Sequence, residues 1–222
     1  MVGTSREEED TGWMYNGNGE LIDIHKELLS FEQVLEFFKH VEKEGRIKEY
    51  CDGSNAGGRW IFQIYSREFI ELLSNIVAKI LKGSGHTGPV LEVMSGDGKL
   101  SEFLKPLVNR TIIATDAKTG RDNIEHPKWV EEIDAIEAFS KYDPSVIIMV
   151  WEPFYSSTGV ELIEKRTGTP ILWIGNPDSC GVGSEISELP CVQIDSEYLL
   201  CRHDNFSDRK HLSRFRAFLN LP

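Results

Sequence analysis

The sequence lacks the features that mark secreted and membrane-spanning proteins. Its 222 residues contain no run of about 18 apolar side chains, the length that a transmembrane helix requires. The first ten residues are polar and acidic, whereas a secretion signal begins with basic residues and continues into an apolar stretch. We therefore expect a cytoplasmic protein with no membrane contact, and leave a nuclear location open.

Cysteine is also scarce, with only four residues in the chain. Cys51, Cys180, Cys191 and Cys201 form no C-x-x-C pair, and both zinc sites and disulfide frameworks depend on closer and more regular spacings. We predict reduced thiols, most of them buried, and no metal site.

Positive charge is in deficit. The chain carries 24 Lys and Arg against 36 Asp and Glu, a formal net charge of −12. A nucleic-acid binder has to neutralise the phosphate backbone, so this composition disfavours generic nucleic-acid binding. Four acids stand in a row at 7–10, and an Asn-Gly-Asn-Gly stretch follows at 16–19. We predict a flexible acidic tail over residues 1–20 and leave open a local docking of the apolar residues at 13–15.

Two amphipathic helices are predicted near the start of the chain. Apolar residues recur every three or four positions from Phe31 to Val41, and Ser30 with Gln33 makes a capping-box pattern. A second helical pattern covers 67–81 and ends in a glycine-rich stretch. We predict an N-terminal helical segment over 21–85 that forms one compact unit with a cofactor-binding α/β domain over 86–222.

Short apolar runs then alternate with helical patterns. The runs cover residues 89–94, 111–115, 129–133, 145–151 and 170–175. This alternation predicts a parallel sheet with crossover helices. Two later strand-like stretches, 191–194 and 198–202, are too close together for a crossover helix and predict an antiparallel hairpin. A final helix is expected over 208–221.

The loop after the first of these runs is the most informative stretch. A strand ending at Val93 leads into a loop that contains Gly96 and Gly98, and an apolar helix pattern follows. In an open α/β sheet such a loop lies at the carboxyl ends of the strands, where ligands bind. Asp116 ends the next strand, where an acid accepts hydrogen bonds from ribose hydroxyls. The simpler alternatives are a tight turn without a ligand and a helix cap at Asp116.

The acids beside this loop help to choose between nucleoside cofactors. NAD and FAD place a pyrophosphate at the helix N-terminus and continue the loop as G-x-G-x-x-G/A, but the last position here is Ser101. Glu92 and Asp97 would repel a pyrophosphate. They would not repel a sulfonium cation that carries an ammonium group, so an NAD-type oxidoreductase is the less favoured interpretation.

These residues resemble the first motif of the class I S-adenosylmethionine-dependent methyltransferases. The family has an apolar strand with an acid followed by Gly-x-Gly-x-Gly, and residues 92–98 match it except at the first glycine, which is Met94. Residues 64–69 and 171–181 also look similar to a group of uncharacterised methyltransferase-like proteins. The resemblance implies an α/β fold with a Rossmann-like open sheet, mostly parallel, of about seven strands with a closing antiparallel hairpin.

The resemblance also implies S-adenosyl-L-methionine as the cofactor. The implied cofactor-binding residues are Tyr65, Arg67, Glu92, Met94, Ser95, Gly96, Gly98, Asp116, Ala117, Asp134 and Ala135. The glycine loop would line the methionine moiety, Asp116 the ribose, and Asp134 with Ala135 the adenine, while Tyr65 and Arg67 would reach the carboxylate. Asp134 is equally well explained as the cap of a helix over 135–142.

Trp151 and Glu152 follow the fourth predicted strand, where the family often places catalytic groups. Trp151 would face the sulfonium through its ring, and Glu152 would orient the acceptor or take its proton. Methyl transfer is a direct displacement and needs no covalent nucleophile on the protein. The expected partner is an unidentified methyl acceptor, either a small molecule or a protein. The alternative is a catalytically inactive methyltransferase-like binding or interaction module, which Met94 favours.

Overall fold

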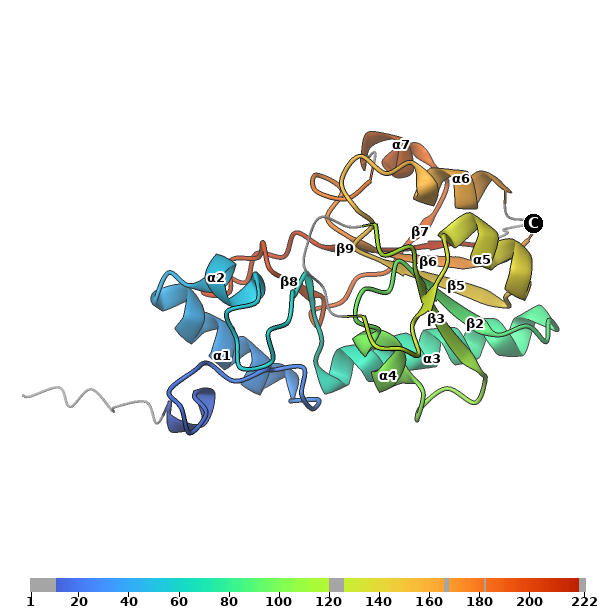
Figure 1. Ribbon diagram of the computed structural model, residues 1–222. Coiled ribbons are helices and arrows are strands. Elements are labelled where there is room, and N and C mark those ends of the chain that lie inside the picture. The colour runs from blue at the N-terminus through green and yellow to red at the C-terminus, as the bar shows by residue number, and fades with distance from the viewer. Residues whose placement is uncertain (1–10, 120–125, 166–167, 182, 220–222) are drawn as a thin grey trace, which may run out of the picture.

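A seven-stranded sheet forms the centre of the computed structural model, which describes residues 11–119, 126–165, 168–181 and 183–219 (Figure 1). The strand order is β4-β3-β2-β5-β6-β9-β7. The strands are β2 (Val90–Val93), β3 (Ile112–Asp116), β4 (Glu131–Glu132), β5 (Val146–Val150), β6 (Ile171–Gly175), β7 (Val192–Gln193) and β9 (Arg214–Phe218). Strands β2 to β6 pair in parallel, and β9 is antiparallel to both of its neighbours. The predicted Rossmann-like architecture is confirmed.

Helices cover both faces of this sheet. One face carries α3 (Arg67–Ser84) and α4 (Lys99–Leu104), and the other carries α5 (Ala135–Tyr142), α6 (Thr158–Lys165) and α7 (Gly183–Glu188) (Figure 1). Successive strand residues alternate between the two apolar layers, with Val90 and Ile148 under α3 and α4, and Leu91 and Ile147 under α5 and α6. The crossovers after the neighbouring strands β2 and β5 therefore go to opposite faces. A doubly wound sheet has its ligand crevice at this switch point.

A second apolar cluster lies beside the sheet and contains the N-terminal elements (Figure 1). It is formed around η1 (Gly12–Met14), α1 (Phe31–Lys43), α2 (Ile47–Cys51), β1 (Gln63–Ile64) and β8 (Leu200–Cys201). Strand β1 pairs antiparallel with β8, so this cluster joins residues 63–64 to residues 200–201, far apart in the sequence. The predicted capping box of α1 is present, and α3 ends at Gly85 with a φ of 62°. No helix within the described ranges is long and apolar enough to cross a membrane.

The predicted C-terminal elements are wrong in two places. Residues 191–194 and 198–202 do not pair with each other, because β7 pairs with β9 while β8 pairs with β1. The helix expected over 208–221 is replaced by β9 in the part of it that the structure describes. Phe215 and Phe218 enter opposite apolar layers, an arrangement that needs the two-residue period of a strand.

The acidic tail expected over residues 1–20 is also corrected. Residues 1–10 lie outside the described part, but residues 13–15 pack on the N-terminal cluster, while residues 17–20 are exposed. Met14 is 1% exposed, and the Tyr15 hydroxyl is 2.8 Å from His40 Nε2 and 2.7 Å from Glu44 Oε1. The local docking of residues 13–15, which the sequence left open, is therefore present.

Met14→Ala should therefore destabilise the protein by about 2 to 5 kcal/mol, because it leaves a cavity in the N-terminal cluster. Urea unfolding would measure this loss. Leu107→Ala is the matched control, since Leu107 is 49% exposed and its truncation should change stability by at most about 0.5 kcal/mol. Equal stability of the two variants would contradict the observed docking of residues 13–15.

Candidate functional site

The carboxyl ends of β2 and β5 lie at the switch point of the sheet, where a doubly wound fold places its ligand. We call the residues around these two strand ends the crevice. Val93 pairs with Met149, so the residues that follow the two strands emerge side by side. Met94 has a φ of 54° and Trp151 a φ of 57°, a backbone conformation that residues with side chains rarely adopt. Such strain persists only where the surrounding structure enforces it, and it is concentrated at functional sites.

The glycine loop, residues 94–98, is tied to its neighbours on both sides. The Ser95 N–H donates to the Thr115 carbonyl at 3.0 Å, and His126 Nδ1 donates to the Gly96 carbonyl at 2.8 Å. A Cβ on Gly98 would lie 2.4 Å from the Trp129 ring, so only glycine fits there. The Ser95 hydroxyl is buried and has no hydrogen-bond partner. The loop therefore holds one polar group that a ligand can satisfy.

Asp116 reaches the glycine loop. One carboxylate oxygen accepts the Gly96 N–H at 2.9 Å, and the other accepts the Lys118 N–H at 2.7 Å. The side chain is half-buried. Each carboxylate oxygen can accept more than one hydrogen bond, so Asp116 can still bind hydroxyl groups. Ala117 lies beside it at the rim.

Glu92 is buried beneath the loop, with 3% exposed. Its Oε2 accepts the Ser101 N–H at 2.9 Å and also the Ser101 hydroxyl. Burial raises the pKa of Glu92 to about 8, the bonds from Ser101 oppose that rise, and the charges of Asp97 and Asp116 add to it. Glu92 therefore braces the start of α4 and is mostly protonated at neutral pH, whereas a cation beside it would favour the charged form.

Arg59 is a site residue that the sequence did not reveal. Its Nη1 donates to Asp97 Oδ2 and its Nε to Asp23 Oδ2, both at 2.7 Å. The arginine predicted for the site, Arg67, is exposed and donates to the Leu28 carbonyl at 3.3 Å. Because the positive charge of Arg59 neutralises Asp97, this carboxylate would not repel a pyrophosphate. Asp97 therefore does not distinguish between a dinucleotide and a cationic cofactor.

Tyr65 lies in an apolar wall against α4. Its ring stacks on His25 with centroids 4.8 Å apart, and its N–H donates to His25 Nε2 at 3.0 Å. Burial lowers the pKa of His25 to about 3, so this histidine is neutral, and burial raises the pKa of Tyr65. His25 was not predicted, because its contacts join it to a residue 40 positions away.

Asp134 caps α5, as the simpler interpretation of the sequence held. One of its oxygens accepts the N–H groups of Ile136 and Glu137, both at 2.9 Å. The Ile133 N–H donates to the Asp116 carbonyl at 3.2 Å, which places Asp134 and the buried Ala135 next to the end of β3. The implied adenine-binding pair is therefore close to the implied ribose-binding residue.

Trp151 is held by the N-terminal segment. Its Nε1 donates to Gln63 Oε1 at 2.9 Å, and its ring packs against Phe62 and His203. Gln63 is 3% exposed and donates in turn to the Leu200 carbonyl. Trp151 is thus fixed at the rim of the crevice by Phe62 and Gln63 on one side and His203 on the other.

Glu152 is 2% exposed and does not face an acceptor. Its Oε1 accepts the Gly159 N–H at 2.7 Å, while its Oε2 is buried without a hydrogen-bond partner. A Cβ on Gly159 or on Gly181 would lie 2.4 Å or 2.6 Å from that oxygen, so the two glycines make room for the carboxyl group. Burial raises its pKa. The geometry gives Glu152 a bracing role between the loops after β5 and β6.

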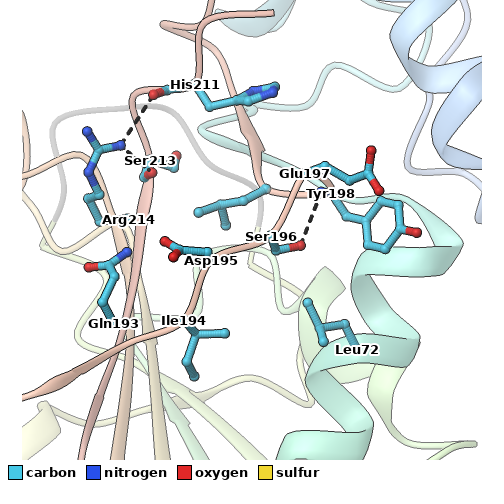
Figure 2. Close-up of a pocket in the computed structure, with 11 residues that line it drawn as sticks. Leu72, Gln193, Ile194, Asp195, Ser196, Glu197, Tyr198, His211, Ser213 and Arg214 are labelled. Carbon is cyan, nitrogen blue, oxygen red and sulfur yellow. Dashed lines mark hydrogen bonds between the residues drawn. The ribbon is translucent and has the colours of Figure 1, made fainter.

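A groove of about 980 Å³ opens at the end of β7, away from the predicted cofactor residues (Figure 2). Residues 194–199 line it together with His211, Ser213 and Arg214, and Leu72 of α3 closes one side. The Ser213 hydroxyl donates to Gln63 Oε1 at 3.3 Å, the oxygen that also accepts from Trp151. The buried side-chain amide of Gln63 is therefore hydrogen-bonded both to the groove, at Ser213, and to the crevice, at Trp151. No three metal-ligating side chains gather into a metal site in the described part of the chain.

Comparison with known proteins yields only distant structural likenesses. No family model matches the chain. No curated protein matches it in sequence. A putative SAM-dependent methyltransferase from Streptococcus mutans is 14% identical with a TM-score of 0.37, over 64% of this chain and 47% of that one. The CurJ carbon methyltransferase is 12% identical with a TM-score of 0.41, over 67% and 53%.

A third similar structure is an rRNA methylase from Streptococcus thermophilus, 14% identical with a TM-score of 0.38, over 64% of this chain and 93% of that one. The matched region spans about half the length of the first two proteins. Similarities at this level carry no argument about function. The assignment of the fold rests on the strand order and register.

Glu92→Gln should change how stability depends on pH. The folded state holds a proton on Glu92 up to about pH 8, whereas the unfolded chain releases it near pH 4.5, so wild type should lose stability relative to Glu92→Gln as the pH rises from about 5 to about 8. Urea unfolding at several pH values measures the difference. Glu36→Gln, on the exposed face of α1, is the control and should show no such trend.

Met94 offers a direct test of backbone strain in the glycine loop. Met94→Gly should be more stable than Met94→Ala by about 1 kcal/mol, because glycine adopts a positive φ without a steric penalty. The same pair of substitutions at Lys39, inside α1, should have the opposite order by a similar amount. Thermal unfolding of the four variants measures these differences. The same order of stability at both sites would show that the backbone at Met94 is not strained.

Proposed function

We propose that the protein is an S-adenosylmethionine-dependent methyltransferase with an unidentified acceptor. One observation carries the proposal: at the switch point of the sheet, Asp116 at the end of β3 is bonded to Gly96 in the loop after β2. This joins a glycine loop, which permits close ligand approach, to an acid that binds hydroxyls. The acceptor is a small molecule or a protein.

The residues around the crevice fit such a cofactor. The unpartnered Ser95 hydroxyl would meet the methionine moiety together with Gly96 and Gly98, and the half-buried Asp116 would accept bonds from the ribose. Asp134 and Ala135 lie one strand further, beside the expected adenine position. When bound, the cofactor supplies a methyl group on a positively charged sulfur.

The chain's own part in the reaction is alignment and exclusion of water. Trp151 stands at the rim, where its ring would face the sulfonium. Glu152 would have to leave its place between two glycines to touch an acceptor, so we assign it a positioning role for the loop after β5. This revises the role that the sequence suggested for it.

A second function, that of a catalytically inactive binding module, is favoured by a specific observation. Met94 occupies a glycine position of the motif in a strained conformation, and the acid after β5 is buried. Such a module would bind the nucleoside and transfer nothing.

Calorimetric titration tests these alternatives together. We expect wild type to bind S-adenosylmethionine and S-adenosylhomocysteine and not NAD. Binding of NAD alone would indicate an oxidoreductase, and binding of none would overturn the proposal. A bound cofactor whose methyl group reaches no acceptor in a lysate or peptide panel would favour the binding module.

Asp116→Ala should weaken S-adenosylmethionine binding by about 1 to 3 kcal/mol, because two ribose hydroxyls lose a charged acceptor. It should also lower stability, since the Gly96 and Lys118 N–H groups lose their partner. Ser30→Ala, which removes the cap of α1 in the N-terminal cluster, is the control and should lower stability without changing affinity. Calorimetry and thermal unfolding measure the two effects, and unchanged affinity in Asp116→Ala would remove Asp116 from the site.

A further inference from the structure

Residues 59–65, which we call the edge strip, connect the N-terminal cluster to both loops of the crevice. Arg59 contacts Asp97 in the glycine loop, and Gln63 contacts Trp151 after β5. Between these two contacts, Ile61 is buried in the N-terminal cluster. The edge strip therefore fixes both crevice loops relative to the same apolar cluster.

The two ion pairs of Arg59 hold its guanidinium group in one orientation. One guanidinium group bridges Asp23 and Asp97, each at 2.7 Å, with side chains 25%, 7% and 25% exposed for Arg59, Asp23 and Asp97. Exposed single ion pairs contribute little, but a planar guanidinium with two charge-assisted bonds in a partly buried place is held in one orientation. A Cβ on Gly57 would lie 2.3 Å from Asp23 Oδ2, so the backbone closes on this pair.

Asp97 transmits this restraint into the glycine loop. Its second oxygen, Oδ1, accepts the Lys99 N–H at 3.1 Å in the first turn of α4. Gly96 and Gly98, on either side of it, have φ values of 55° and 73° and no side chains to hold them. Among the side chains of residues 94–98, Asp97 alone carries a charge that can anchor the loop.

We propose that Arg59 is a positioning residue that sets the conformation of the glycine loop through Asp97, and thereby the affinity for the methionine end of the cofactor. The inference rests on the proposed function. The adenosine end is assigned to Asp116, Asp134 and Ala135. Asp116 accepts the N–H groups of Gly96 and Lys118, and Asp134 accepts those of Ile136 and Glu137, so neither carboxylate is bonded to Arg59 or Asp97. Loss of Arg59 should therefore weaken binding at the methionine end more than at the adenosine end.

Two ligands separate these ends. S-adenosylhomocysteine contains the amino-acid portion, whereas 5′-methylthioadenosine has the same adenosine and lacks it. In Arg59→Ala we expect affinity for S-adenosylhomocysteine to fall about tenfold and affinity for 5′-methylthioadenosine to stay within about twofold of wild type in calorimetric titration. Arg59→Lys should recover part of the loss, because one ammonium group can pair with Asp97 but cannot reproduce the bridge.

Arg46→Ala is the matched control. Arg46 also bridges two carboxylates, Glu44 and Glu49, on the N-terminal cluster away from the crevice. It should leave both affinities unchanged. A double-mutant cycle with Asp97→Asn tests the route: if Arg59 acts through Asp97, the double variant should bind S-adenosylhomocysteine no more weakly than the weaker single variant.

The possible outcomes are distinct. Equal losses for both ligands in Arg59→Ala would show a general structural role and overturn the inference while leaving the proposed function intact. Unchanged affinities, or additive effects in the cycle, would overturn it as well. If wild type binds neither ligand, the proposed function fails, and the role of Arg59 in cofactor recognition falls with it.

Discussion

The opposite crossovers after β2 and β5 determine where each candidate residue lies. The two strands are neighbours in register, yet their chains leave the sheet toward different faces, so no helix covers the gap between their ends. Met94 and Trp151 are the first residues after β2 and β5, and both have a positive φ. The strained backbone therefore coincides with the switch point of the sheet.

The crevice contains three acidic side chains, Glu92, Asp97 and Asp116, and the structure stabilises them in two ways. Arg59 and the N–H groups of Gly96, Lys99 and Lys118 satisfy Asp97 and Asp116. Glu92, which is fully enclosed, is relieved instead by holding a proton. A cation that binds beside Glu92 would stabilise the ionised carboxylate. Binding of the cation would therefore be coupled to release of the Glu92 proton.

Sequence reasoning located the sheet and the glycine loop because both depend on local patterns. Four apolar strands with crossover helices were predicted at nearly their observed positions, and Ser30, Gly98 and Asp134 were recognised from their immediate neighbours. It missed β1, which is two residues long and shows no period, and it located β8 but gave it the wrong partner. Arg59 lies 38 positions from Asp97, and Gln63 lies 88 positions from Trp151. Contacts at such separations are set by the fold and leave no signal in a single sequence.

The pairing of β1 with β8 joins Gln63 to Cys201, and Phe206 completes the N-terminal cluster by stacking on Phe38. During synthesis α1 and α2 would leave the ribosome long before these partners exist. The part of their apolar surface that Leu200 and Phe206 cover would stay exposed until more than 200 residues have been made, and contacts of such long range form slowly. The N-terminal cluster therefore lacks its final packing for most of synthesis. Since β9 follows β8 along the chain, the last residues of this cluster and the last strand of the sheet are synthesised close together.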